Sequence, residues 1–236
     1  MVLTDAAKFF ASWKILVPGE AVLNGPLQLD AGHFAAFAQS FAPAFRAHQR
    51  NGSMANIWRS AAGIGHGELR NSQVLRWILD SNGDHGRGSA ILEGLVTLAG
   101  KQRPLGFTAA EVSGSVYRTR TEVHPLGGAE NRVDIEVASA KFLIFIEVKV
   151  RSGESGDQLP RYVDDARTKA AGRPRVVIYL TPDGRRPHDK ELHDEIVSVS
   201  WKQVASILEA HVDNDTSESF SGQLFRQFAK HIRLLK

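Results

Sequence analysis

The sequence contains no cysteine and no long apolar run. Without cysteine, the chain cannot form a disulfide framework, a thiolate zinc site or a cysteine nucleophile, which is compatible with the cytosol. The longest apolar run, Phe142 to Ile146, has the length of a buried strand and is far short of the roughly 18 residues that a membrane span needs. The N-terminus lacks a basic segment followed by an apolar stretch, so we expect no signal peptide. We therefore expect a cytoplasmic protein without a membrane partner.

A strong charge of either sign is also absent. The formal net charge is +3, from 29 Lys and Arg against 26 Asp and Glu. This mild excess permits a polyanionic partner but does not require one. With 236 residues, of which 42% are apolar and 23% charged, the composition is that of a folded globular protein. The chain is long enough to bury a substantial core without a structural metal.

The pattern of apolar residues divides a single domain, 1–236, into three parts. Residues 1–67 are expected to form a helical N-terminal extension, because Phe34, Phe37, Phe41 and Phe45 recur at three- and four-residue steps. Such a stripe is typical of core packing. Residues 68–200 are expected to form a mixed α/β core, and residues 201–236 to form C-terminal helices.

Within the core, helical and strand periodicities alternate. Helices are expected at about 68–79, 89–99 and 156–171, with a short one near 190, and strands at about 115–123, 132–137, 141–150, 175–180 and 196–199. The stretch Leu143 to Ile146 is apolar on both faces, which indicates a central strand covered on both sides.

Charged residues interrupt the two central strands at places where burial is expected. Glu147 and Lys149 lie two residues apart, so their side chains point to the same face of their strand. Asp134, between Val133 and Ile135 on the preceding strand, can lie beside Glu147 across the ladder. A buried carboxylate and ammonium are costly unless they have a use. This arrangement therefore predicts a functional site.

The residue types at this site favour a hard divalent cation. Two carboxylates held close together repel each other unless a cation lies between them. Oxygen ligands favour Mg²⁺, with Mn²⁺ as a substitute, over zinc. Such an ion polarises a phosphoryl oxygen and activates water, and Lys149 could orient that water or neutralise charge on the phosphate. The pattern thus favours phosphodiester hydrolysis.

The same residues resemble the PD-(D/E)xK nuclease superfamily. Asp134 is similar to the first acid of that motif, although Val133 replaces the proline before it, and Glu147-Val148-Lys149 is similar to the second half. Many members carry a Q-x-x-x-Y pair on the next helix, where this chain has Gln158 and Tyr162. Members also commonly supply an acid from the first core helix, which Glu68 matches. The resemblance covers about residues 68–182.

The resemblance implies a restriction-endonuclease-like α/β core of a helix, three consecutive strands, a helix and a strand, with added helices at both ends. It implies Mg²⁺ held by Asp134, Glu147, Glu68 and Val148, of which valine can offer only its backbone, and catalysis by those acids together with Lys149 and Gln158. The expected substrate is DNA, in restriction, phage defence or repair. A homodimer and a protein partner bound through the N-terminal helices are further expectations from analogy.

Several alternatives stay open at this point. The enzyme could cleave RNA, or the fold could be a non-catalytic module that binds nucleic acid or protein. Glu68 is also an ordinary first-turn glutamate favoured by the helix dipole. Glu136 shares a face with Asp134, and we expect it at an exposed edge rather than at the metal.

Basic residues near strand ends form two small groups in the sequence, Arg173 with Arg175, and Arg185 with Arg186 and Lys190. Each group has two open interpretations. It could be simply solvated, or it could lie along a nucleic-acid backbone.

Overall fold

The computed structural model describes residues 31–50, 57–58, 62–127, 132–151, 153, 156–213 and 219–236. The chain forms two compact units, residues 1–55 and residues 56–236. Among the described residues, no helix has both the length and the apolar character to cross a membrane.

The first unit contains helix α2, Ala31–Arg50, with Pro43 inside it. The rings of Phe37 and Phe41 stack with their centroids 5.4 Å apart, as the predicted helical spacing requires. Their exposed fractions are 39% and 47%, so these two residues do not lie in a core, contrary to our expectation. Residues 1–30 and the side chains of Phe34 and Phe45 lie outside the described part of the chain.

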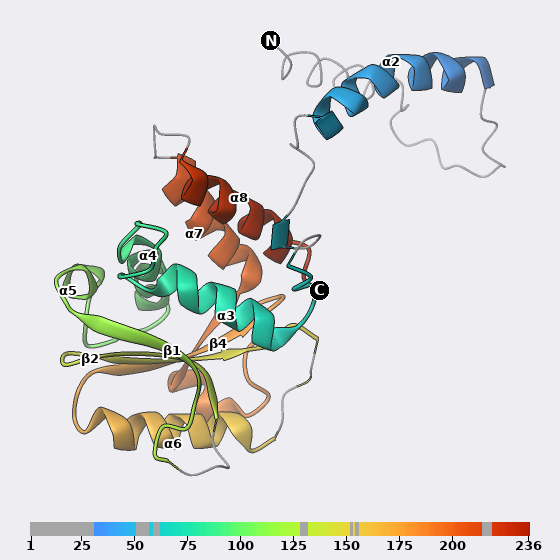
Figure 1. The fold of residues 1–236 in the computed structure, drawn as a ribbon. Coiled ribbons are helices and arrows are strands. Elements are labelled where there is room, and N and C mark those ends of the chain that lie inside the picture. Colours follow the sequence, from blue (N-terminus) through green and yellow to red (C-terminus); the bar gives the residue numbers. More distant parts are fainter. Residues whose placement is uncertain are drawn as a thin grey trace. The chain divides into compact units, whose positions relative to one another are not determined.

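The second unit is built on a five-stranded sheet with the order β1-β2-β3-β4-β5 (Figure 1). Strands β1 to β3 form an antiparallel meander, whereas β3, β4 and β5 run parallel. The strands are β1 Tyr117–Val123, β2 Val133–Ser139, β3 Leu143–Val148, β4 Arg175–Thr181 and β5 Ile196–Ser200. The carboxyl ends of the three parallel strands therefore meet at one edge of the sheet.

Helices cover both faces of this sheet. Helix α6, Gln158–Ala170, lies on one face, and the other helices pack against the opposite face (Figure 1). These are α3 Glu68–Leu79, α4 Ala90–Gly100, α7 Trp201–Asp213, and α8 Phe220–Ile232, which packs on α7. Two short elements, α5 Ala109–Ser113 and the 3₁₀ helix η2 Lys190–Asp194, complete the described fold.

Strand β3 is the centre of the molecule, as its apolar sequence predicts. All six of its residues are buried. Ile144 and Ile146 belong to the large core on the side of α3 and α7, and Leu143 and Phe145 belong to a smaller core under α6. Because both faces are covered, a polar side chain on β3 must find its partners inside the protein.

The α/β class and the order of helix, three strands, helix and strand are confirmed. Helix α5 was not predicted, although a capping box between Thr108 and Glu111 is visible in the sequence. The expectation for Glu136 was wrong, because β1 pairs with β2 and so removes β2 from the sheet edge. Glu136 is fully buried, and its carboxylate forms ion pairs with Arg120 at 2.6 Å and Lys169 at 2.5 Å.

Candidate active site

The register of β2 against β3 brings two carboxylates together. Ile135 pairs with Ile146, so the next step of this antiparallel ladder places Asp134 opposite Glu147, on the α6 face. The backbone N–H of Val148 donates to Asp134 Oδ2 at 2.8 Å, which fixes the aspartate against β3. The predicted juxtaposition of Asp134 and Glu147 is therefore present in the fold.

Lys149 completes this group from the end of β3. Its Nζ lies 2.7 Å from Glu147 Oε1 and donates to Gln158 Oε1 at 3.0 Å. Glu147 is fully buried and Lys149 is 7% exposed, so their attraction is little screened by water. Burial lowers the pKa of Lys149, but the carboxylates of Glu147, Glu68 and Asp134 outweigh it and raise that pKa above its ordinary value.

The pKa of Asp134 shows the cost of placing two acids side by side. Burial and then the nearby charge of Glu147 raise it from 3.8 to about 8, against the opposing effect of the Val148 N–H. The Val148 N–H and the charge of Lys149 only partly offset these effects, so the ionised form of Asp134 needs further stabilisation. A divalent cation between the two carboxylates would supply it.

The N-terminus of α3 points an acid at the same strand. Glu68 is the first residue of α3, and its Oε1 accepts hydrogen bonds from the backbone N–H of Val150 at 2.8 Å and of Arg151 at 3.4 Å. The predicted inward stripe of α3 is also present, because Ser72, Leu75 and Leu79 are buried. Glu68 therefore reaches the carboxyl end of β3, immediately beyond Lys149.

Helix α6 contributes two residues that hold Lys149 in place. Gln158, the first residue of α6, accepts from Lys149 and donates through Nε2 to the hydroxyl of Tyr162 at 3.2 Å. The Tyr162 hydroxyl in turn donates to the carbonyl of Arg132 at the start of β2. Burial and the charges of Glu147 and Asp134 raise the pKa of Tyr162, which stays a neutral donor. These hydrogen bonds link α6 to β2 and to Lys149 at the end of β3.

A residue that sequence reasoning missed also fixes the lysine. Trp201, fully buried at the start of α7, donates its indole N–H to the backbone carbonyl of Lys149 at 3.0 Å. The N–H of Lys149 donates to the carbonyl of Leu180 on β4 at 2.8 Å. In the sequence, Trp201 is marked only by its position directly after a short buried strand. That position does not predict which group accepts the hydrogen bond from its indole N–H.

The carboxylates of Asp134 and Glu147 are suitable ligands for a hard divalent cation, although they do not form a complete coordination shell. Among the described residues, no hydrogen-bond donor of suitable geometry reaches either carboxylate oxygen of Glu147, despite the Lys149 ammonium at 2.7 Å. Two buried oxygens with little compensation, beside a second acid of raised pKa, are a donor set that Mg²⁺ would stabilise.

A third acidic ligand does not join Asp134 and Glu147 among the described residues. In the described part of the chain, no three His, Asp or Glu side chains are grouped closely enough to hold a metal. One carboxylate oxygen of Glu68, Oε1, accepts from two backbone N–H groups. Asp134 and Glu147 are thus the pair best placed for the ion, and the roles of Glu68 and Val148 as ligands stay predictions.

One comparison with known proteins gave a match. A family model described as the PD-(D/E)XK nuclease superfamily matches residues 56–230, which is most of the chain and includes every residue of the site. No curated protein and no solved structure gave a significant match.

Proposed function

The chain belongs to the PD-(D/E)XK nuclease superfamily, and from that premise we propose that it is a magnesium-dependent nuclease that hydrolyses phosphodiester bonds in DNA. The observation that carries the proposal is the group formed by Asp134, Glu147 and Lys149 on two adjacent buried strands. The carboxylates supply hard oxygen ligands, and the ammonium supplies a positive charge next to them.

Each residue of the site has a distinct part in this proposal. Asp134 and Glu147 would hold Mg²⁺, or Mn²⁺ in its place, and the bound ion would supply polarisation of a phosphoryl oxygen and activation of water. Lys149 orients the attacking water and stabilises negative charge on the phosphate. Gln158 keeps the Lys149 ammonium in position through its 3.0 Å hydrogen bond. Glu68 supports the ion or its water from the end of α3.

The choice of DNA rather than RNA is part of the proposal and is open to a direct test. Purified protein is incubated with supercoiled plasmid, linear duplex DNA, single-stranded DNA and RNA, each in Mg²⁺, Mn²⁺ or EDTA. We expect cleavage of DNA that EDTA abolishes. Cleavage of RNA alone would show that the substrate is RNA. If no nucleic acid in the panel is cleaved, a non-catalytic binding module would explain the fold better than a nuclease.

A matched pair of variants separates the site from contamination. Glu147→Gln keeps the shape of the side chain but removes a buried charge, whereas Glu191→Gln removes an exposed charge from η2. We expect a loss of about 100-fold or more in Glu147→Gln and none in Glu191→Gln. Equal cleavage by both variants would show that the activity arises elsewhere.

A further inference from the structure

A basic pocket of about 360 Å³ opens at the carboxyl ends of β3 and β4. Five of the residues that line it are basic and one is acidic: Arg151, Arg185, Lys202, Arg233, Lys236 and Asp183. The Asp134, Glu147 and Lys149 side chains are not part of the lining of this pocket. Its charge nevertheless makes it a place for an anion.

Within the described part of the chain, most cations of the pocket form no ion pair with a carboxylate. Arg233 is engaged by Glu209, but no described carboxylate forms an ion pair with the side chains of Arg151, Arg185 or Lys202. The lone acid, Asp183, is held by hydrogen bonds from its own turn. Among the described residues, the basic side chains of the pocket outnumber its one acidic side chain, so the pocket has a net positive charge.

The side chain of Arg185 is a second, independent indication that the pocket binds an anion. Its Nε is buried, and no hydrogen-bond partner for it exists among the described residues. A buried donor without a partner costs free energy, and a charged one costs more. Arg185 lines the pocket, so an anion bound there would place negative charge beside this guanidinium.

The pocket is joined to the active site through the backbone of Lys149. Three chain segments meet there: β3 itself, Leu180 of β4, which accepts from the Lys149 N–H, and Trp201 of α7, which donates to its carbonyl. Each segment enters the pocket within two residues, at Val150, Pro182 and Lys202 respectively. Two residues span at most about 7 Å, so the pocket borders the backbone of Lys149.

We propose that this pocket binds a phosphate group of the nucleic-acid substrate next to the scissile one. The inference rests on the proposed nuclease function and adds to it a contact between the protein and a second phosphate, which positions the nucleic-acid strand. Arg185 donates from its guanidinium, and Lys202 and Arg151, which also line the pocket, supply further positive charge. The phosphate is either internal to the strand or at its 5′ end, and both sources offer the same oxygens.

The test measures binding rather than cleavage. Fluorescence anisotropy of a labelled DNA duplex in EDTA gives the dissociation constant over a range of salt concentrations. We expect Arg185→Gln and Lys202→Gln each to weaken binding about 10-fold, as the loss of one charge-assisted hydrogen bond would. Each should also lower the slope of log K against log salt by about 0.9, which a purely structural change would not do.

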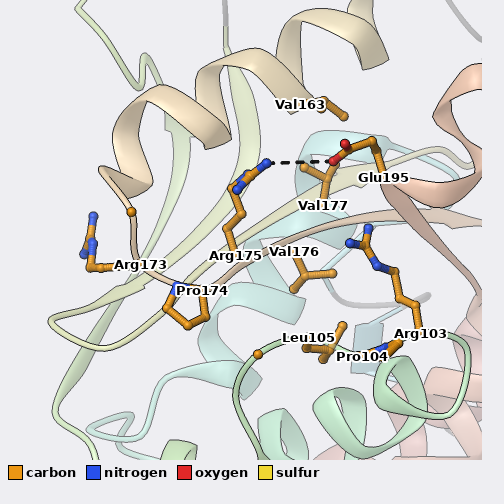
Figure 2. A pocket seen from close by; sticks show the side chains of 12 residues that line it. Arg103, Pro104, Leu105, Val163, Arg173, Pro174, Arg175, Val176, Val177 and Glu195 are labelled. Carbon is orange, nitrogen blue, oxygen red and sulfur yellow. Dashed lines mark ion pairs between the residues drawn. The ribbon is translucent and has the colours of Figure 1, made fainter.

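An arginine at the opposite end of β4 supplies the control. Arg103 lines a separate pocket of about 330 Å³ at the amino end of that strand. Arg175 lines the same pocket and pairs with Glu195 at 3.8 Å (Figure 2). Arg103→Gln removes one charge and should leave both the dissociation constant and the salt slope unchanged. Pocket variants that bind like the native protein, or a control that loses as much as they do, would overturn the inference.

Three forms of DNA distinguish the source of the phosphate. A 5′-phosphorylated linear duplex, the same duplex with 5′-hydroxyl ends, and a closed circle compete for the native protein and for Arg185→Gln. A defect confined to the phosphorylated duplex supports the inference with a terminal phosphate, and a defect with all three supports it with an internal one. If DNA is cleaved but the variants bind normally, only this inference fails; if they bind weakly but nothing is cleaved, only the proposed nuclease activity fails.

Discussion

Replacement of Asp134 by asparagine should stabilise the metal-free protein, even though it removes a residue of the site. The folded state raises the pKa of Asp134 from 3.8 to about 8, so it favours the protonated acid. Between about pH 4 and pH 8, Asp134 is ionised in the unfolded chain but protonated in the folded protein. The free energy of unfolding of the native protein therefore falls as the pH rises through this range. Asparagine cannot ionise, and its side-chain oxygen can still accept from the Val148 N–H.

The size of the effect follows from the same shift. Each pH unit between the two pKa values is worth 1.36 kcal/mol, which sets an upper limit of about 4 kcal/mol at pH 7. We expect urea denaturation in EDTA, followed by tryptophan fluorescence, to show Asp134→Asn more stable by about 1 kcal/mol near pH 5 and by about 2–4 kcal/mol near pH 7. A difference that does not grow with pH would refute the reasoning.

Magnesium should narrow the difference in stability between the two proteins. An ion that binds only the folded state adds RT ln(1 + [L]/Kd), or about 1.4 kcal/mol at ten times its dissociation constant. Native protein should gain this stabilisation and Asp134→Asn should not. Asp183→Asn is a control of opposite sign, because hydrogen bonds outweigh slight burial and lower the pKa of Asp183. That variant should lose a little stability above pH 4, and a gain equal to that of Asp134→Asn would contradict the account.

Three further substitutions test the framework around the site. Glu136→Gln should cost about 1–3 kcal/mol in urea denaturation, because it removes a buried charge whose two cations are partly exposed, but metal-dependent cleavage should persist. Trp201→Phe should cost about 1–2 kcal/mol and reduce the cleavage rate at saturating substrate, because it removes the hydrogen bond to the Lys149 carbonyl. Ala171→Gly should raise stability by about 0.5–1 kcal/mol, because Ala171 ends α6 with a φ of 49°, a conformation that glycine adopts without strain.

The contrary results are equally specific. Complete loss of cleavage in folded Glu136→Gln would place that acid in the catalytic machinery. Full activity of Trp201→Phe would show that the Lys149 backbone needs no support from α7. A less stable Ala171→Gly would mean that the entropy of the unfolded chain outweighs the relief of strain.

Local chemistry explains which parts of the fold were predictable. The apolar run of β3 and the alternation around Asp134 are properties of neighbouring residues, so a sequence is enough to predict a central strand and the pairing of Asp134 with Glu147. The positions of α3 and α6 follow in the same way from helical periodicity. These elements carry most of the candidate site.

The rest depends on contacts between residues far apart in the chain. Glu136 is buried because β1 pairs with the edge of β2 and α6 places Lys169 next to its carboxylate. The alternation of apolar and polar residues in β2 predicts neither of these contacts. The bond from Trp201 to Lys149 joins residues 52 positions apart. The orientation of Glu68 toward the N–H of Val150 likewise depends on where α3 lies against the end of β3.

The most direct test of the central claim is anomalous diffraction from crystals of the protein soaked with Mn²⁺. The account predicts a peak within coordination distance, roughly 2.0–2.4 Å, of carboxylate oxygens of both Asp134 and Glu147, with the peak absent from Glu147→Gln crystals. A peak bound elsewhere, or no peak in well-ordered native crystals at saturating Mn²⁺, would contradict it.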